Sequence, residues 1–362
     1  MPLVRRGTAA VTCAAALAVT CALPARAQQQ PASPTFTVNG MEVTLGARVQ
    51  TQLNTSSVDS VPATDWLLRR ARVELSTRYG PLVAGRLQVD FAGNRVALKD
   101  AYVRLNFHPA LSVLAGNAHR PFGAIAQTNS AQMAPIERGV RIRGLRARDE
   151  YALVTDLGYA ERDVGVQLMG RPDLPLRPFY AAAFTNGPVH TVGGGERSYQ
   201  LSARAGFQPL PGVTLGGSWG RRDFVQPAAG SAPARSRGGQ AWAIDAEVGG
   251  YRPGPHAVAE LAFGDGDPFA GRRFLGAQGW ISYRTKPLGS RVASVEPLIR
   301  VSHGDPDTDL DAPEDGAGTL ITPGFNVYLG GLNRVMFNYD FWRGAHGAPS
   351  GQSFKAQFQM AF

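Results

Sequence analysis

The chain has 362 residues, and its 37 Lys and Arg against 28 Asp and Glu give a formal net charge of +9 at neutral pH. Both of its cysteines, Cys13 and Cys21, lie close to the N-terminus, so residues 28–362 contain no disulfide, thiolate metal site or cysteine nucleophile. After the N-terminal segment, no apolar run approaches the roughly 18 residues that a membrane-spanning helix needs.

Residues 1–27 have the features of a secretory signal peptide. Two arginines precede an uncharged run rich in Ala, Val and Leu, and the segment closes on Ala25-Arg26-Ala27, a cleavage site of the A-x-A type. A transmembrane anchor is the weaker interpretation, because the apolar run is short and a cleavage site follows it. We therefore expect residues 28–40 to be a polar N-terminal lead-in and residues 41–362 to form the folded body.

Export and charge together limit the partners of the chain. A basic exported protein is separated from nucleic acid by its compartment, so no nucleic-acid partner is predicted. Its charge points instead toward small anionic solutes, lipopolysaccharide phosphates or acidic proteins. Two structural classes fit an exported chain without a spanning helix: a soluble β-protein and an outer-membrane β-barrel.

Segments in which polar and apolar residues alternate recur along residues 41–362. In residues 68–79, LRRARVELSTRY, polar Arg70, Arg72 and Glu74 alternate with apolar Val73 and Leu75. Period-two alternation is the signature of strands whose two faces meet different environments. In chain order, the sixteen predicted strands are residues 41–53, 68–79, 82–92, 98–107, 111–118, 163–171, 177–185, 198–208, 213–222, 240–248, 257–264, 274–284, 292–302, 319–329, 333–342 and 353–362.

The connections between these strands alternate between short and long. A soluble sandwich gives no reason for this alternation, whereas outer-membrane barrels have short periplasmic turns and long outer loops. The predicted fold class is thus all-β, a transmembrane antiparallel β-barrel of about 16 strands located in the outer membrane of a Gram-negative-type bacterium. The long connections are residues 54–64, 119–162, 186–197, 223–239, 265–273, 304–318 and 343–352.

A barrel assigns opposite environments to the two faces of each strand. Val73, Leu75, Val89 and Val103 are then expected to face lipid, while a single strand taken alone would fit a soluble core equally well. The predicted pore wall is net positive and contains Arg48, Arg70, Arg72, Arg78, Arg86 and Arg104. An aromatic girdle at the strand ends is predicted from Tyr79, Phe107, Trp219 and Trp342, and the last strand has one apolar face with Phe354, Ala356, Phe358, Met360 and Phe362.

Several motifs in the first third of the expected mature chain resemble the phosphate-selective porin O and P family. They are LRRARVELSTRYGPLVAGRLQVDFAG from Leu68, ALKDAYVRLNF from Ala97, RPFG from Arg120 and APIERG from Ala134. The resemblance implies a sixteen-stranded, usually trimeric barrel that conducts anions, with a long third loop, here residues 119–162, folded into the pore. Residues 117–120 depart from the family's Gln-aromatic-Lys pattern, and the third loop lacks lysine, so anion conduction carries over better than phosphate specificity.

The densest basic cluster is RGVRIRGLRAR, residues 138–148, in the predicted third loop. Rings of arginine are an expected lining of anion pores, and arginine pairs bidentately with phosphate-like oxygens. Two other interpretations stay open: a surface loop that contacts lipopolysaccharide, and internal pairing with Glu137, Asp149 and Glu150. The candidate anion filter consists of Arg120, Arg138, Arg141, Arg143, Arg146 and Arg148.

No cofactor, metal site or catalytic residue is predicted. The Asp305–Asp311 segment has alternating aspartates like a calcium loop, but Leu310 and Gly316 stand where an EF-hand needs Gly and Glu. A solvated acidic loop is the better interpretation. The sequence predicts an outer-membrane porin for small anionic solutes, with phosphate or polyphosphate as candidates, rather than an enzyme. The alternatives are a barrel-type outer-membrane hydrolase and a secreted β-rich binding or adhesion protein.

Overall fold

The computed structural model describes residues 33–58, 61–93, 95–187, 199–226, 235–289, 291–309 and 316–362. The predicted signal peptide lies outside the described residues. Within the predicted lead-in, a short strand β1 (Thr35–Val38) pairs with the start of β2. Among the described residues, no helix is both long enough and apolar enough to cross a bilayer.

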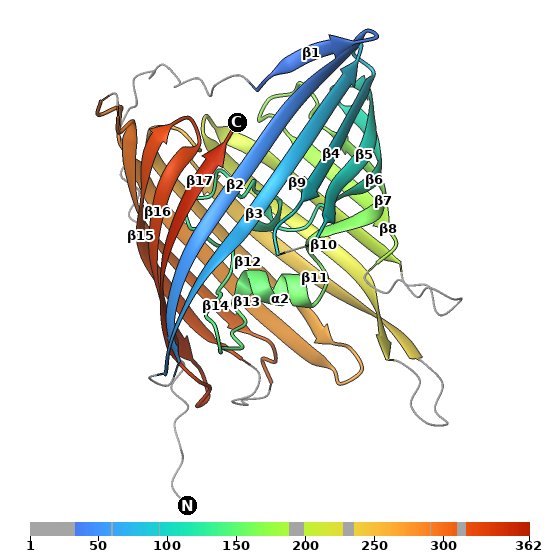
Figure 1. Cartoon of the computed structure of the whole chain (residues 1–362). Coiled ribbons are helices and arrows are strands. Elements are labelled where there is room, and N and C mark those ends of the chain that lie inside the picture. Colours follow the sequence, from blue (N-terminus) through green and yellow to red (C-terminus); the bar gives the residue numbers. More distant parts are fainter. Residues whose placement is uncertain are drawn as a thin grey trace, which may run out of the picture.

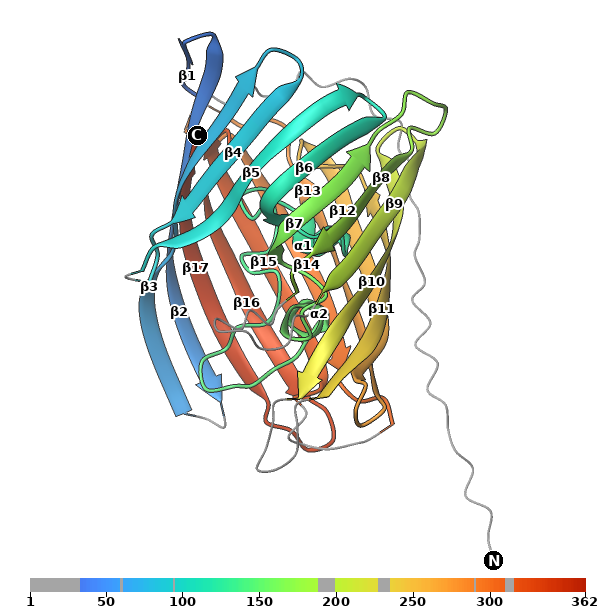
Figure 2. The same ribbon diagram turned by 90° about the vertical axis from the view of Figure 1, so that its right-hand side faces the viewer.

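Sixteen strands, β2–β17, form one closed antiparallel barrel (Figures 1 and 2). Each strand pairs with its neighbours in sequence, and β17 closes the barrel against β2, from Gly351↔Val58 to Ala361↔Arg48. The prediction of an all-β barrel of sixteen strands is confirmed. The strands are β2 Met41–Val58, β3 Val61–Tyr79, β4 Val83–Asp90, β5 Ala97–His108, β6 Leu111–His119, β7 Arg162–Gly170, β8 Phe179–Thr185, β9 Gln200–Leu210, β10 Val213–Gln226, β11 Arg235–Val248, β12 Gly254–Asp267, β13 Arg272–Arg284, β14 Ser294–Asp305, β15 Gly318–Gly330, β16 Asn333–Gly344 and β17 Gly351–Ala361.

The two faces of the wall follow the alternation in the sequence. Val73 and Val103 are exposed on the outside, at 45% and 54%, whereas Gln88 is 2% exposed on the inside. In β17, Phe358 and Met360 point outward while Lys355 is buried inward. Trp342 was expected in the outer girdle, but its position in β16 turns it inward, where it packs against the third loop.

Short connections gather at one end of the barrel, which we call the turn end, and the opposite end is the loop end. At the loop end, the predicted long connection at residues 54–64 is wrong, because β2 runs to Val58 and β3 begins at Val61. The predicted connection at residues 265–273 is also shorter, since β12 reaches Asp267 and β13 starts at Arg272. The added ends of β2 (Asn54-Thr55-Ser56-Ser57) and β12 (Asp265-Gly266-Asp267) have no apolar side chain on either face, so the alternation disappears there while the pairing persists.

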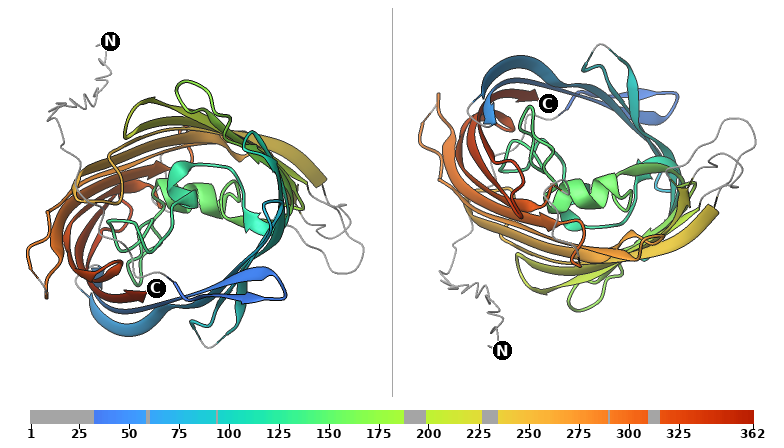
Figure 3. Two further views of the ribbon diagram at one scale, coloured as in Figure 1. Left: turned by 90° about the horizontal axis from the view of Figure 1, so that it is seen from above. Right: turned by 90° about the horizontal axis from the view of Figure 1, so that it is seen from below.

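The segment 120–161 between β6 and β7, loop L3, folds back into the barrel, as predicted for the third loop (Figure 3). It contains two short helices, α1 (Ala124–Gln127) and α2 (Glu150–Asp156), and Asp149 caps α2 by accepting from the Ala152 amide at 3.1 Å. An apolar cluster fixes L3 to the inner wall of β11–β13, with Tyr159 stacked between Phe122 and Phe274 at centroid distances of 5.8 and 6.0 Å. Apolar burial of this kind supplies a core inside an otherwise polar lumen.

Candidate functional site

Loop L3 leaves two cavities beside the β3–β9 side of the wall. The first, of about 1020 Å³, lies toward the loop end and is lined by β3, the β4–β5 connection and L3. The second, of about 840 Å³, lies toward the turn end and reaches the β5–β6 turn. The two share no lining residue, and adjacent Lys99 and Asp100 of β5 face the first and the second respectively. The side chains between the cavities form the candidate pore constriction.

Polar side chains of the wall fix the L3 backbone on the side away from the cavities. Arg334 donates to the carbonyls of Ala131 and Met133 at 2.9 and 2.7 Å, and Arg300 donates to the carbonyl of Glu137 at 2.6 Å. Buried carbonyls need such donors because water does not reach them. These arginines therefore serve the loop's structure and leave its opposite edge to the cavities.

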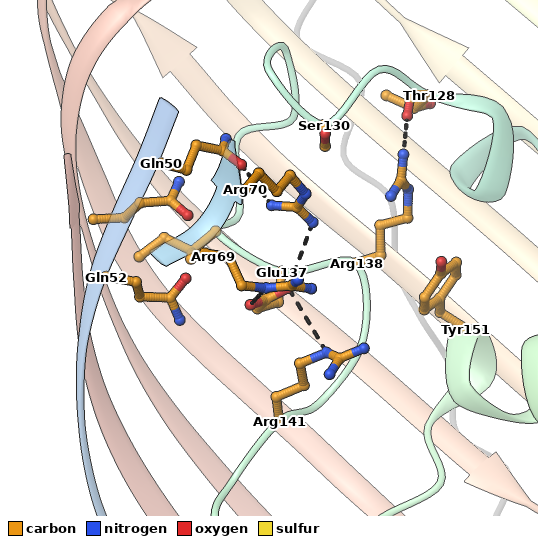
Figure 4. Close-up of polar contacts among 12 residues, drawn as sticks. Gln50, Gln52, Arg69, Arg70, Thr128, Ser130, Glu137, Arg138, Arg141 and Tyr151 are labelled. Carbon is orange, nitrogen blue, oxygen red and sulfur yellow. Dashed lines mark hydrogen bonds and ion pairs between the residues drawn. The ribbon is translucent and has the colours of Figure 1, made fainter. Parts of the chain in front are cut away.

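Glu137 joins L3 to β3 across the loop-end cavity (Figure 4). Its carboxylate accepts from Arg69 Nε at 2.6 Å and Nη2 at 2.9 Å, and Arg70 and Arg141 lie 3.8 and 3.9 Å away. Burial alone would raise the pKa of Glu137, but these cations outweigh it and hold the pKa well below its ordinary value. A buried carboxylate shared by several arginines fixes the loop in register with the wall.

Arg69 reaches this carboxylate because of a β-bulge. Gln50 pairs with Arg70 and the next residue, Thr51, pairs with Leu68, so Arg69 has no partner across β2. Regular alternation would place Arg69 outside and Arg70 inside. The bulge brings both side chains to the lumen, where Arg70 donates to Gln50 Oε1 at 2.7 Å. Bulges commonly re-aim side chains beside functional sites.

Arg138 is the L3 residue that spans the constriction. Its Nε donates to the carbonyl of Ile125 at 3.2 Å, its Nη2 donates to the carbonyl of Thr128, and its guanidinium lies 5.8 Å from the ring centroid of Tyr151. Arg138 lines the loop-end cavity while Thr128 lines the turn-end cavity. Within the described chain, no carboxylate forms an ion pair with Arg138, so neutral acceptors hold a full positive charge in place.

The wall opposite Arg138 carries a row of ion-paired arginines. Arg72 pairs with Asp90 at 2.8 Å and Arg162 with Asp100 at 2.6 Å, and the positive charges of Arg162 and Arg138 both act on Arg72. Arg86 bridges Glu74 at 2.7 Å and Asp100 at 3.2 Å. Cations outnumber carboxylates here; the cations are Arg48, Arg69, Arg70, Arg72, Arg86, Lys99, Arg138 and Arg162, and the carboxylates are Glu74, Asp90, Asp100, Glu137 and Glu161.

The six candidate filter arginines of L3 do not lie together. Arg138 alone of the six borders the constriction; Arg141 and Arg143 are exposed toward the loop end, and Arg143 pairs with Asp65 there. Arg146 is exposed, Arg148 lies 3.9 Å from Asp156 at the end of α2, and Arg120 is buried near Asp163 of β7. The interpretation as internal pairing with Glu137, Asp149 and Glu150 thus describes Arg141, which lies 3.9 Å from Glu137, whereas Arg120 lies 3.6 Å from Asp163 instead, and only Arg138 keeps the geometry of a filter residue.

The six predicted wall arginines all lie on the inward-facing set of positions. Arg48 donates to Ser130 of L3 at 2.7 Å, and Arg104 lines the turn-end cavity. Arg78 is exposed at the turn end of β3 and lines none of the cavities described above. Arg70, Arg72 and Arg86 form the ion pairs described above.

The sequence analysis missed Arg69, Lys99 and Arg162, and it named Glu137 only as a possible internal partner of the arginines. Strict alternation assigns Arg69 and Lys99 to the outer, lipid-facing side of their strands. A single charged residue among apolar residues on that side is unexpected, and this signal could have identified both as lumen-facing. Arg162 stands at the boundary between L3 and β7, where pattern analysis is least certain. Glu137 was considered as an internal partner of the arginines, and its four-residue spacing to Arg141 was the available signal.

Behind L3 lies a group of buried carboxyls. Glu260 of β12 accepts from the Ile125 amide at 3.1 Å, and Asp149 accepts from the Val140 amide at 3.0 Å. Burial raises the pKa of Glu150 well above its ordinary value, and the neighbouring charges of Glu260 and Asp149 raise it further. Across the described ranges there is no group of three or more His, Cys, Asp or Glu suited to a metal ion, and Asp307 instead pairs with Arg272 at 3.4 Å.

No family model matches the chain, and no curated protein matches its sequence. Solved structures match its fold. OmpF of Salmonella typhi in complex with daunomycin has a TM-score of 0.61 at 12% identity, covering 90% of this chain and 100% of that one. An anion-selective porin from Comamonas acidovorans has a TM-score of 0.58 at 13% identity, covering 89% and 100%. OmpT of Vibrio cholerae in its trimer form has a TM-score of 0.54 at 12% identity, covering 89% and 100%. The chain therefore has the fold of general outer-membrane porins, and this likeness does not single out the phosphate-selective family.

Proposed function

We propose that the protein is a passive diffusion channel for small anionic solutes in the outer membrane of a Gram-negative bacterium. The observation that carries this proposal is Arg138, a cation without a carboxylate partner among the described residues, held between two cavities by neutral carbonyls. The closed wall with an apolar outer face supports the location, because barrels satisfy every backbone group within lipid.

The mechanism follows from the charges at the constriction. A small anion entering the loop-end cavity meets an excess of guanidinium and ammonium groups, which replace part of its hydration shell. Attraction is strongest where the path is narrow and poorly hydrated. Cations are repelled by the same groups, so the channel selects by size and charge without a chemical step.

Phosphate or polyphosphate is the finer proposal for the solute. Arginine forks match the geometry of phosphate oxygens, and Lys99 places one lysine beside the arginines although L3 has none. The neighbouring structure from Comamonas acidovorans is described as an anion-selective porin, which favours a channel over the alternative of a barrel-type hydrolase.

We further propose homotrimers and a contact with lipopolysaccharide. Strands β4–β8 have 7 to 12 residues, whereas β10–β13 have 13 or 14, so the wall is low on one side. Neighbouring copies would cover that side. Arg143 and Arg146 are exposed at the loop end, where lipopolysaccharide phosphates would lie. Cross-linking in native membranes tests the trimer, and a monomeric pattern would reject it.

Reversal potentials in a potassium chloride gradient test the channel proposal. Arg138→Gln removes the unpaired cation and should lower the anion-to-cation permeability ratio severalfold, because the local potential at the constriction falls. Arg146→Gln removes the same charge from the loop's exposed edge and serves as the matched control, with little change expected. A parent channel without anion selectivity, or equal behaviour of the two variants, would reject the proposed filter.

A further inference from the structure

The turn-end cavity has an apolar strip on its wall. Leu114 of β6, Met169 of β7 and Phe179 of β8 all line this cavity. They belong to the lumen face, because Leu168 and Phe184, which alternate with them, are 47% and 51% exposed on the outer face. The strand register makes each of the three the diagonal neighbour of the next across the sheet. Side chains of this size reach one another at that spacing, so the three form one continuous strip.

Two arginines stand at the ends of the strip. Arg104 of β5 pairs directly with Leu114, and the guanidinium of Arg171, just after β7, lies 5.5 Å from the ring centroid of Phe179. Both arginines line the cavity, and within the described ranges neither forms an ion pair with a carboxylate. Arg104 Nε is shielded from solvent and has no acceptor among the described residues. A buried donor without an acceptor is costly, so this nitrogen is a place for a ligand oxygen.

The other charged side chains of this cavity have partners on the wall. The pairs are Arg204 with Asp245, Arg86 with Asp100 and Glu247 with His256, at 2.7, 3.2 and 3.0 Å. Arg204 also rests against Phe179, with its guanidinium 5.6 Å from the ring centroid. Arg104 and Arg171 are therefore the cations of this cavity that stay available to a ligand.

We propose that the turn-end cavity is a binding site for aromatic carboxylates, with the carboxylate on Arg104 and the ring on the strip of Leu114, Met169 and Phe179. This inference rests on the proposed anion channel and adds a second site and a solute class to it. Small inorganic anions gain only from the positive potential. An aromatic carboxylate gains additionally by removing its ring from water and by contact with the Met169 thioether.

The size and place of the cavity agree with this role. Its volume of about 840 Å³ is in the range of small-molecule sites and exceeds what one aromatic acid needs. Short turns of outer-membrane barrels face the periplasm. A solute that enters from outside thus reaches the strip after it has passed Arg138.

Block of chloride current tests this proposal in planar bilayers with the full-length channel. Benzoate is the probe, and acetate is the matched probe with the same carboxylate and no ring. Benzoate should reach half block at a concentration about tenfold below that of acetate, because part of its ring is buried.

Four variants locate the site. Met169→Ser should raise the benzoate concentration for half block by about fivefold and leave the acetate value unchanged, because it removes apolar contact area alone. Met169→Leu should keep the parent value. Gln208→Ser trims a polar side chain of the same cavity and is the matched control, with no change expected. Arg104→Gln should weaken block by both carboxylates, since it removes the charge they share.

Methionine oxidation gives a second measurement that needs no variant. Peroxide converts accessible methionine to the sulfoxide, which peptide mass spectrometry detects. Met169 is partly exposed to the cavity, and Met41 is 37% exposed at the turn end, whereas Met133 and Met336 are buried. Benzoate should slow the oxidation of Met169 at the concentrations that block current and leave Met41 unprotected. Acetate should protect neither residue.

The outcomes separate this inference from the function on which it rests. A parent channel that lacks anion selectivity would reject both. An anion-selective parent that benzoate and acetate block alike would reject the aromatic site alone. Equal effects of Met169→Ser and Gln208→Ser would remove the strip from the binding of benzoate. Benzoate block that is lost in Arg138→Gln and kept in Arg104→Gln would place the site at the constriction, and absence of Met169 protection would exclude contact with the ring.

Discussion

Glu137→Gln should loosen residues 136–142 of loop L3 from β3 while the barrel stays folded. The carboxylate is 3% exposed and bonds Arg69 at 2.6 and 2.9 Å, with Arg70 and Arg141 close by. Removing one partner of a buried ion pair costs about 3–5 kcal/mol. The lower end applies here, because Arg69 is 22% exposed and glutamine keeps one acceptor. About 3 kcal/mol corresponds to roughly a hundredfold change in the opening equilibrium.

Amide hydrogen exchange of residues 136–142 measures this opening, and single-channel recordings should show larger current fluctuations as L3 moves. Asp65→Asn is the matched control, because it breaks the Arg143–Asp65 pair, whose side chains are 60% and 38% exposed. Exposed pairs contribute about 1 kcal/mol or less, so exchange should rise no more than about fivefold. Combining Arg69→Met with Glu137→Met should recover part of the loss, since the Arg69 guanidinium is then not left without its carboxylate and Arg70 keeps its hydrogen bond to Gln50.

Acid provides an additional check on the same contact. The folded-state pKa of Glu137 lies well below 4.5, so the stability that its ionisation contributes is present above pH 4.5 and is lost only as pH falls through the lowered value. Protection of residues 136–142 should therefore persist in mild acid. Equal exchange rates in Glu137→Gln and Asp65→Asn, or loss of protection already near pH 4.5, would refute the anchoring role.

Three further predictions concern the wall, the buried carboxyls and the loop's docking. Val103→Lys should impair assembly by roughly 2–4 kcal/mol on the lipid face, whereas Tyr102→Lys, on the lumen face, should fold; equal heat-modifiable gel mobility of the two would contradict this register. Because burial raises the pKa of Glu150, L3 should lose stability as pH rises above 4.5, and Glu150→Gln should reduce that dependence in hydrogen exchange, with the remainder due to Asp149, whose pKa burial also raises; an unchanged pH profile would exclude Glu150 as a source. Gly304→Ala places a methyl group against the carbonyl oxygen of Arg148, closer than any non-bonded contact allows, so L3 should shift and conductance should change, and a parent-like channel would show that the loop docks elsewhere.

Local sequence was enough to determine the wall. In each strand, successive residues such as Arg72 and Val73 point to opposite faces, so their polarity indicates which face meets the lumen and which meets lipid. This assignment can be made without information from the rest of the chain. All sixteen predicted strands are present for this reason, and the long segment before Arg162 indicated a loop inside the pore through the resemblance to a porin family. Strand ends were less accurate, because the alternation disappears at residues 54–64 although pairing continues.

Tertiary structure decided which charges meet the solute. Sequence offered five arginines between Arg138 and Arg148, but the path of L3 over the apolar cluster around Tyr159 and its attachment through Glu137 left Arg138 at the constriction and exposed Arg143 and Arg146. Two bulges, at Arg69 in β3 and at Lys99 in β5, turn these side chains inward and arise from a mismatch between paired strands. A bulge arises because one strand has an extra residue relative to its paired neighbour, so it depends on both strands. The alternation within either strand alone therefore cannot predict it.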